Sequence, residues 1–62
     1  MLIEFFLIIN HLSGKALQAS LNEIGEIVIW TIQGNDNQLW FWDQYEEDIL
    51  RNKMFPDKVV SK

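Results

Sequence analysis

Few residues in this chain have the types and spacing that catalysis requires. His11 and Ser13 could supply a base and a nucleophile, but such a pair needs a third group to orient the base, and no triad is evident. Glycoside hydrolysis requires two carboxylates held at a fixed separation. Asp43 and Glu46 supply the two residue types, but nothing in the sequence indicates that separation. The acidic run 46–48 lacks the alternating oxygen ligands and internal glycine of a calcium loop. We therefore expect a protein that is not an enzyme.

Metal and cofactor sites find little support in the composition. The chain has no cysteine, which excludes disulfides, thiolate zinc sites and iron-sulfur clusters. His11 is the one histidine, which argues against a histidine-based metal cluster. No metal and no cofactor are expected.

Amide and indole side chains are concentrated in residues 35–42, Asn-Asp-Asn-Gln-Leu-Trp-Phe-Trp. Gln38 stands two residues before Trp40, and Trp42 follows two residues later. An Asn/Asp/Gly turn lies at the start of this segment, after the apolar run 27–32. These residues are the first candidates for binding chemistry, and their positions depend on the elements around them.

The elements are predicted to be strands. Short apolar runs alternate with polar turns at intervals of roughly ten residues, which is typical of an all-β fold. Within the fourth run, the period of two places Gln38, Trp40 and Trp42 on one face. An alternative helix over 38–50, with Asn37 as its N-cap, stays open. Strands are expected at 5–10, 16–19, 27–32, 38–43, 49–52 and 58–61, with turns at 13–15, 22–26 and 33–37.

The chain also repeats itself. Residues 7–10, a turn and residues 15–17 are echoed by residues 49–52, a turn and residues 58–60, with one residue inserted. The period is about 42 residues, and it is visible one and a half times. Repeats this short usually cannot bury a core alone.

Together, the repeat and the Gln38-x-Trp40 segment resemble the ricin-B-type (R-type) lectins, which carry a Gln-x-Trp signature. The resemblance covers the chain from about Phe5 to Lys62. Members of that family have a β-trefoil fold of three four-stranded repeats and bind galactose-like sugars. The resemblance implies one partial β-trefoil domain over residues 1–62, with one repeat at 1–46 and the first half of a second at 47–62.

The resemblance also implies a shallow carbohydrate site. Trp30 matches the family's stacking aromatic, and Asn37 matches its hydroxyl-binding amide. Gln18 stands where the family has an aspartate, and Ser61 stands at the same place in the second copy. A neutral amide lacks the charge-assisted hydrogen bond of a carboxylate, which is about twice as strong. The candidate carbohydrate-binding residues are Gln18, Trp30, Asn37 and Gln38.

Each of these residues also suits a purely structural role. Gln38 is expected to point inward and satisfy backbone groups of the preceding turn. Trp40 and Trp42 suit the core or an interface, and Asn37 suits a turn. For Trp30 the two roles are evenly balanced. A structural or interaction module, or a lectin fragment that keeps only the trefoil framework, is therefore the alternative to carbohydrate binding. A small helix-containing oligomer is a second alternative.

Size and composition point to a partner. A chain of 62 residues forms at most one small domain with a small interior, yet 48% of its residues are hydrophobic. Part of this apolar surface is expected to meet another chain. Since one repeat is a third of a trefoil, we expect self-association, most simply as a threefold ring, or a longer parent protein.

The charge argues against two classes of partner. A net charge of -4 and a pI near 4.6 disfavour nucleic acid and anionic membranes. The apolar start, residues 1–9, lacks a basic residue and is too short to span a bilayer, so a buried strand is favoured over a cleaved signal and no membrane insertion is expected. The absence of cysteine slightly favours a reducing, cytoplasmic compartment, although the localisation stays open.

Overall fold

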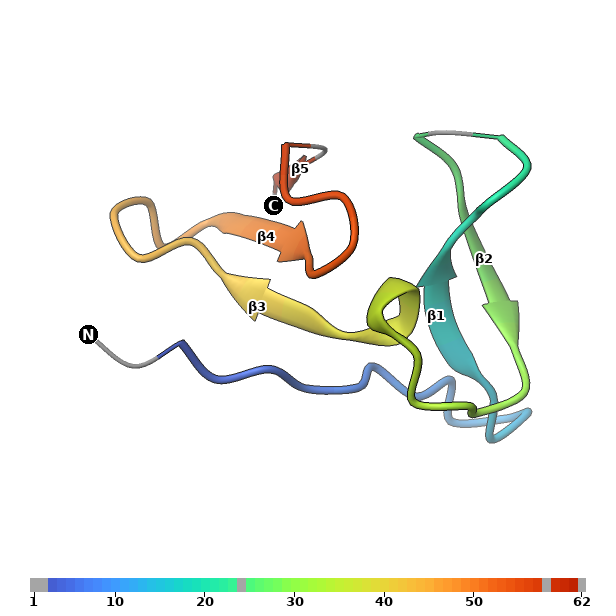
Figure 1. Ribbon diagram of the computed structural model, residues 1–62. Coiled ribbons are helices and arrows are strands. Elements are labelled where there is room, and N and C mark those ends of the chain that lie inside the picture. The colour runs from blue at the N-terminus through green and yellow to red at the C-terminus, as the bar shows by residue number, and fades with distance from the viewer. Residues whose placement is uncertain (1–2, 24, 58, 62) are drawn as a thin grey trace.

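The chain folds as an all-β structure in the computed structural model, which describes residues 3–23, 25–57 and 59–61 (Figure 1). The all-β prediction is confirmed for this part of the chain. The elements in order are β1 (Ala16–Ala19), β2 (Ile27–Trp30), the 3-10 helix η1 (Asp36–Gln38), β3 (Trp40–Trp42), β4 (Ile49–Asn52) and β5 (Val59–Ser61).

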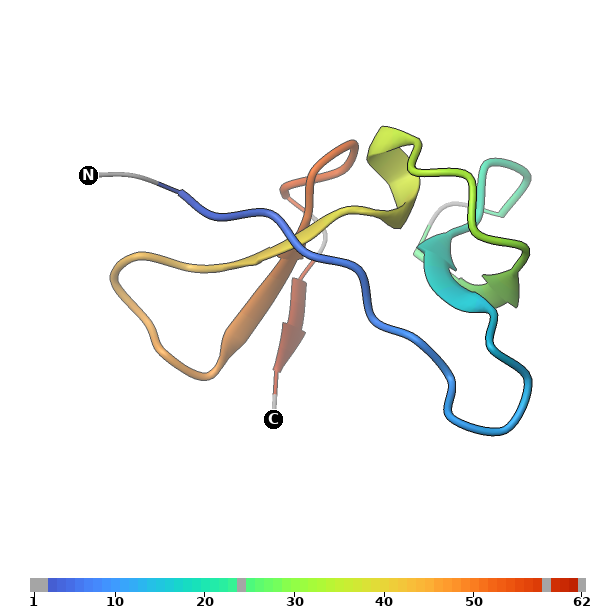
Figure 2. The same cartoon turned by 90° about the horizontal axis from the view of Figure 1, so that it is seen from below.

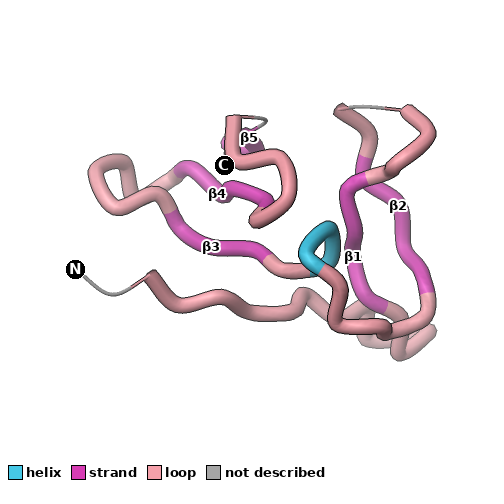
Figure 3. The backbone as a smooth tube through the Cα atoms, in the orientation of Figure 1, coloured by secondary structure: helices cyan, strands magenta, loops and turns pink. Residues whose placement is uncertain are grey.

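The strands form two antiparallel groups. β1 and β2 make a hairpin, and β3, β4 and β5 make a three-stranded sheet in that order. Figures 1 and 3 show η1 between the two groups, and Figure 2 shows the N-terminal segment running from the three-stranded sheet to the hairpin. The backbone of that segment pairs with each group through one isolated bridge, Phe6 with Trp40 and Ile9 with Ala16. The expected strand at 5–10 is therefore present as extended backbone with two single bridges, and the expectation that it is buried is wrong, because none of its residues is buried.

Local chemistry explains the turns. Gly14 has a φ of +71°, a left-handed conformation that glycine adopts without steric cost, as expected for the turn at 13–15. Asn10 closes the same turn, because its side-chain oxygen accepts hydrogen bonds from the backbone N–H groups of Leu12 (3.2 Å) and Ser13 (3.0 Å). The first hairpin connection is thus fixed by an amide at one end and a glycine at the other.

Two predicted strands are shorter than expected. The strand at 27–32 ends at Trp30, because the carbonyl of Thr31 bonds to the Gln38 side chain instead of to a strand. The strand at 38–43 begins at Trp40, because residues 36–38 turn as η1. The helical alternative for 38–50 is wrong, since β3, the turn that follows it and the start of β4 occupy that stretch. Of the last predicted strand, residues 59–61 form β5, and Lys58 lies outside the described residues.

The core lies where η1 and β3 meet β1. Trp40 is 1% exposed, which confirms its predicted place in the core, and its indole N–H donates to the Leu17 carbonyl at 3.1 Å. Much of the rest of the core is polar, because the side chains of Asn37, Gln38 and Asn52 are buried with it. Each buried polar side-chain atom among the described residues has a hydrogen-bond partner, so this polar interior carries no desolvation penalty from unpaired groups.

The predicted internal repeat is visible in the backbone pairing. The bridge between Ile9 and Ala16 recurs as the pair Arg51 and Val59 of β4 and β5, 42 residues later on the first strand and 43 on the second. The turn closure recurs as well, since the Asn52 side-chain oxygen accepts hydrogen bonds from the backbone N–H groups two and three residues ahead (3.0 and 3.3 Å), as Asn10 does. The same strand-and-turn arrangement is thus built twice in the chain.

Candidate functional site

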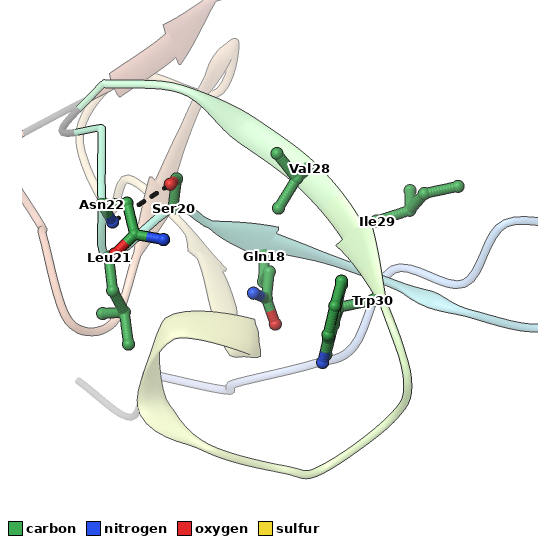
Figure 4. A pocket seen from close by; sticks show the side chains of 7 residues that line it. All are labelled: Gln18, Ser20, Leu21, Asn22, Val28, Ile29 and Trp30. Atoms are coloured by element: carbon green, nitrogen blue, oxygen red, sulfur yellow. Dashed lines mark hydrogen bonds between the residues drawn. The ribbon is translucent and has the colours of Figure 1, made fainter.

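A hollow of about 420 Å³ lies on the β1–β2 hairpin and its connecting loop (Figure 4). Two of the four candidate residues, Gln18 and Trp30, line it. Polar and apolar groups share its wall, which also includes Ser20, Leu21, Asn22, Val28 and Ile29. Ligand pockets typically combine apolar and aromatic side chains with a few polar groups, and both kinds of residue line this hollow.

Hairpin register brings Gln18 and Trp30 together. Gln18 is directly opposite Val28, and Ala16 is directly opposite Trp30. Alternate residues of a strand share a face, so all four of these side chains lie on one face of the hairpin. The residue paired with Trp30 is small, which leaves the indole without a large cross-strand neighbour. Trp30 accordingly remains 56% exposed.

Gln38 packs against this face of the hairpin, where it bonds to the Gln18 side chain, and it is fully buried. Its side-chain oxygen accepts the backbone N–H groups of Gln33 (2.7 Å) and Gly34 (2.9 Å). Its side-chain nitrogen donates to the Thr31 carbonyl (2.8 Å) and to the Gln18 side-chain oxygen (3.0 Å). An amide side chain has two donor hydrogens and two acceptor lone pairs, so Gln38 is completely satisfied. The prediction that it points inward and satisfies the turn is confirmed.

The bonds of Gln38 also orient Gln18. The N–H groups of Gln33 and Gly34 require the oxygen of Gln38 on their side, so the nitrogen of Gln38 must face Gln18. Only the oxygen of Gln18 can accept from that nitrogen, which leaves the Gln18 nitrogen free to turn toward the hollow. Within the described part of the chain, this nitrogen has no hydrogen-bond acceptor. Gln18 therefore presents a donor.

The loop after β1 contributes the other polar groups of the hollow. The Ser20 hydroxyl oxygen accepts the backbone N–H groups of Asn22 (3.2 Å) and Glu23 (3.1 Å), which folds the loop back over the end of the strand (Figure 4). The side chain of Asn22 is exposed at the rim. Sequence reasoning missed Ser20 and Asn22, although the polar residues of the loop after β1 were the available signal.

Asn37 does not line the hollow. It is 4% exposed, and its side-chain nitrogen donates to the Ala19 carbonyl at 3.1 Å. Its own backbone carbonyl accepts a hydrogen bond from the Asn52 side chain at 2.8 Å. Asn37 thus ties η1 to β1 on one side and to β4 on the other. The structure places Gln18 and Trp30 at the surface, with Asn37 and Gln38 as buried support.

A second polar cluster surrounds Asp43, away from the hollow. One carboxylate oxygen accepts a hydrogen bond from the Arg51 side chain at 2.6 Å, and the other accepts the backbone N–H groups of Tyr45 (2.9 Å) and Glu46 (2.8 Å). The Arg51 hydrogen bond, followed by those two backbone bonds, lowers the pKa of Asp43 below its usual value. Both oxygens of Asp43 are thereby used in closing the turn between β3 and β4.

Metal-binding clusters and membrane-spanning helices are both absent from the described residues. No three histidine, cysteine, aspartate or glutamate side chains in residues 3–23, 25–57 and 59–61 gather where they could hold a metal ion. The same stretches contain no helix with the length and apolar character needed to cross a membrane.

Comparisons with protein-family models, curated proteins and solved structures found no match.

Proposed function

We propose that this chain binds carbohydrate, with galactose-type sugars as the first candidates, in the hollow beside Trp30 and Gln18. The observation that carries the proposal is the half-exposed indole of Trp30 on the same hairpin face as an amide whose donor is unused. A sugar ring offers an apolar face that stacks on an aromatic ring, and hydroxyl oxygens that accept hydrogen bonds from amide nitrogens. We include in this proposal the ricin-B-type resemblance and a partial β-trefoil fold.

The four candidate residues take different parts in the proposed site. Trp30 stacks against the sugar, and the Gln18 nitrogen donates to a hydroxyl oxygen. Gln38 acts through Gln18, because it fixes which end of that amide faces the hollow. Asn37 supports the strand that carries Gln18 through its hydrogen bond to Ala19. A site with one ring and few polar contacts binds weakly, so repeated sites would raise the overall affinity through avidity.

Retention on a galactose resin tests the proposal. The wild-type chain is expected to be delayed relative to its elution from an unmodified resin, and free galactose is expected to release it. Trp30→Ala should abolish the delay, because it removes the stacking surface. Trp42→Ala is the matched control: Trp42 is 46% exposed, but it lies on β3, outside the hollow. Circular dichroism must show that both variants keep the wild-type fold.

A module without sugar binding is the second candidate function. It is favoured by the burial of Asn37, whose amide nitrogen bonds to protein backbone, and by the neutral Gln18 at the position of the family's aspartate. The same resin experiment decides between the two. A folded wild-type chain that no galactose resin or glycan array retains would reject carbohydrate binding and leave the interaction module.

A further inference from the structure

The edge segment (residues 3–9) is hydrogen-bonded along one side only. Phe6 exchanges two backbone hydrogen bonds with Trp40, both 2.9 Å long, and the Ile8 carbonyl accepts from the Leu17 N–H at 2.9 Å. Backbone groups of successive residues in an extended chain point to opposite sides. The N–H and carbonyl groups of Phe5 and Leu7 therefore face the other side, where no residue in the described part of the chain bonds to them.

The internal repeat shows what kind of element fits this free side. Ile49 and Arg51 are the counterparts of Leu7 and Ile9, 42 residues later. Their backbone faces β3, since the Ile49 carbonyl accepts from the Asp43 N–H at 2.9 Å and Arg51 pairs with Phe41. In the second copy of the repeat, the equivalent edge is thus occupied by an antiparallel strand. The free side of the edge segment is therefore suited to pairing with another strand.

No described strand of the same chain is free to take this place. β3 is bonded to Phe6 on one side and to β4 on the other, and β4 lies between β3 and β5. β1 pairs with β2 on one side, and its Ala16 pairs with Ile9 on the other. β2 and β5 are at sheet ends, where they are held by their pairing with β1 and with β4. A second copy of the chain can supply such a strand, and the longest open edge that it offers is its own edge segment.

We infer that two copies of this chain pair antiparallel through their edge segments, with Leu7 of one copy opposite Leu7 of the other. This register aligns the free backbone groups of Phe5 with those of Ile9 in the second copy, so both edges are satisfied together. It also places Glu4, the one charge in the segment, opposite Asn10 of the second copy instead of opposite another Glu4. The pairing is two-fold symmetric, as most homodimers are, and it differs in this from the threefold ring expected from the sequence.

Composition and surface area support a second copy as the occupant. Ile3, Phe5, Leu7 and Ile9 are all exposed on one face of the segment, and it contains none of the lysine or proline residues that commonly protect edge strands of monomers. The solvent-accessible surface area of the chain is 4707 Å², whereas a folded monomer of its mass is expected to have about 4,200 Å². The excess of about 500 Å² is a large part of the about 800 Å² that one partner buries in a stable interface.

A charge-exchange experiment at the two-fold axis tests the pairing. Sedimentation equilibrium of the wild-type chain should give a mass that rises with concentration to twice 7.4 kDa. Leu7→Lys places two ammonium groups opposite each other and removes apolar contact, so it should weaken the dimer by about tenfold or more. Leu7→Glu should do the same. An equimolar mixture of the two variants should dimerise again, because opposite charges then meet at the axis.

Two further variants distinguish pairing through the edge segment from pairing through the open edge of β2. Ile29→Lys is the matched control, because Ile29 is exposed on β2, and this variant should dimerise like the wild type. Leu7→Pro removes the N–H at the free edge, which makes no bond within the described part of the chain, and should give a folded monomer.

Three results would overturn the pairing. The wild type could have the mass of one or of three chains at every concentration, Leu7→Lys alone could dimerise normally, or the mixture of Leu7→Lys and Leu7→Glu could stay monomeric. Pairing through the edge segment does not depend on sugar binding. A chain that forms the dimer but does not bind galactose would contradict the proposed function and not the pairing.

Discussion

The side-chain nitrogen of Gln38 donates a hydrogen bond to the side-chain oxygen of Gln18 at 3.0 Å. Gln38 is itself held by the backbone of residues 31, 33 and 34. A chain of hydrogen bonds thus runs from the loop after β2, through a buried amide, to an amide in the wall of the hollow. The geometry of this loop and the orientation of Gln18 are coupled.

Replacing Gln38 should destabilise the whole fold. Gln38→Ala removes four hydrogen bonds and leaves N–H and carbonyl groups of the 31–34 loop without partners, so we expect a loss of about 2–4 kcal/mol in the free energy of unfolding. Urea denaturation followed by circular dichroism measures this loss. Gln44→Ala, on the exposed β3–β4 turn, is the control and should change stability by less than about 0.5 kcal/mol. Equal effects of the two substitutions would contradict the framework role of Gln38.

Gln18→Glu should tighten galactose binding, if the proposed function holds. One carboxylate oxygen can keep the hydrogen bond from Gln38, while the other presents a charged acceptor to the hollow. We expect about fivefold tighter binding at neutral pH, from a gain of about 1 kcal/mol. Isothermal titration with galactose measures it, and Gln33→Glu adds the same charge outside the hollow as a control. Unchanged affinity in a folded Gln18→Glu variant would argue against a ligand at this residue.

Asp43 should make stability depend on pH in the acid range. Its pKa in the folded chain is lowered, chiefly by the hydrogen bond from Arg51, relative to an unfolded value of about 3.9. A group with a lowered folded pKa contributes stability above the unfolded pKa, and this contribution is lost as the pH falls through the folded pKa. The free energy of unfolding of the wild type should therefore exceed that of Asp43→Asn near neutral pH. This difference should shrink as the pH falls below about 5.

The measurement is a series of urea denaturations of both proteins from pH 7 downward. Glu47→Gln removes the same charge from an exposed site, and it controls for the change in net charge. An advantage of the wild type over Asp43→Asn that stays constant with pH would show that the bonds of the Asp43 carboxylate do not stabilise the fold.

The two equivalent asparagines should differ in their importance. Asn10 and Asn52 close corresponding turns, but Asn52 is 2% exposed and also donates to the Asn37 carbonyl at 2.8 Å. We expect Asn10→Ala to cost about 1 kcal/mol and Asn52→Ala about 2–4 kcal/mol in the free energy of unfolding. Thermal or urea denaturation of each variant provides the values. A larger cost for Asn10→Ala would contradict the central position assigned to Asn52.

Much of the fold was predictable because its signals are local. Strands β1, β2 and β4 follow from short runs that are rich in apolar or β-branched residues between turns, and the repeat predicted the second strand-and-turn unit. Gln38 was expected to be inward because a polar residue on the face of a buried tryptophan needs partners. In each case neighbouring residues were sufficient for the prediction.

The misses depend on distant contacts. The segment at 5–10 was predicted as a regular strand, but a strand needs a continuous partner, and this chain provides single bridges. Asn37 was expected in a turn or at the carbohydrate site, and it is buried because its side chain reaches the Ala19 carbonyl, 18 residues away. Gln18 and Trp30 came from family positions, whereas Ser20 and Asn22 join them in the hollow only once the hairpin loop has folded back.

The polar core has a consequence for the temperature dependence of stability. Exposing apolar surface raises the heat capacity on unfolding, whereas exposing amide groups lowers it. Three of the buried side chains among the described residues are amides, so the heat capacity of unfolding should fall below the usual value of about 12–15 cal/mol/K per residue. The stability curve should be correspondingly flat, so cooling should weaken this fold less than it weakens a domain of similar size with an aliphatic core.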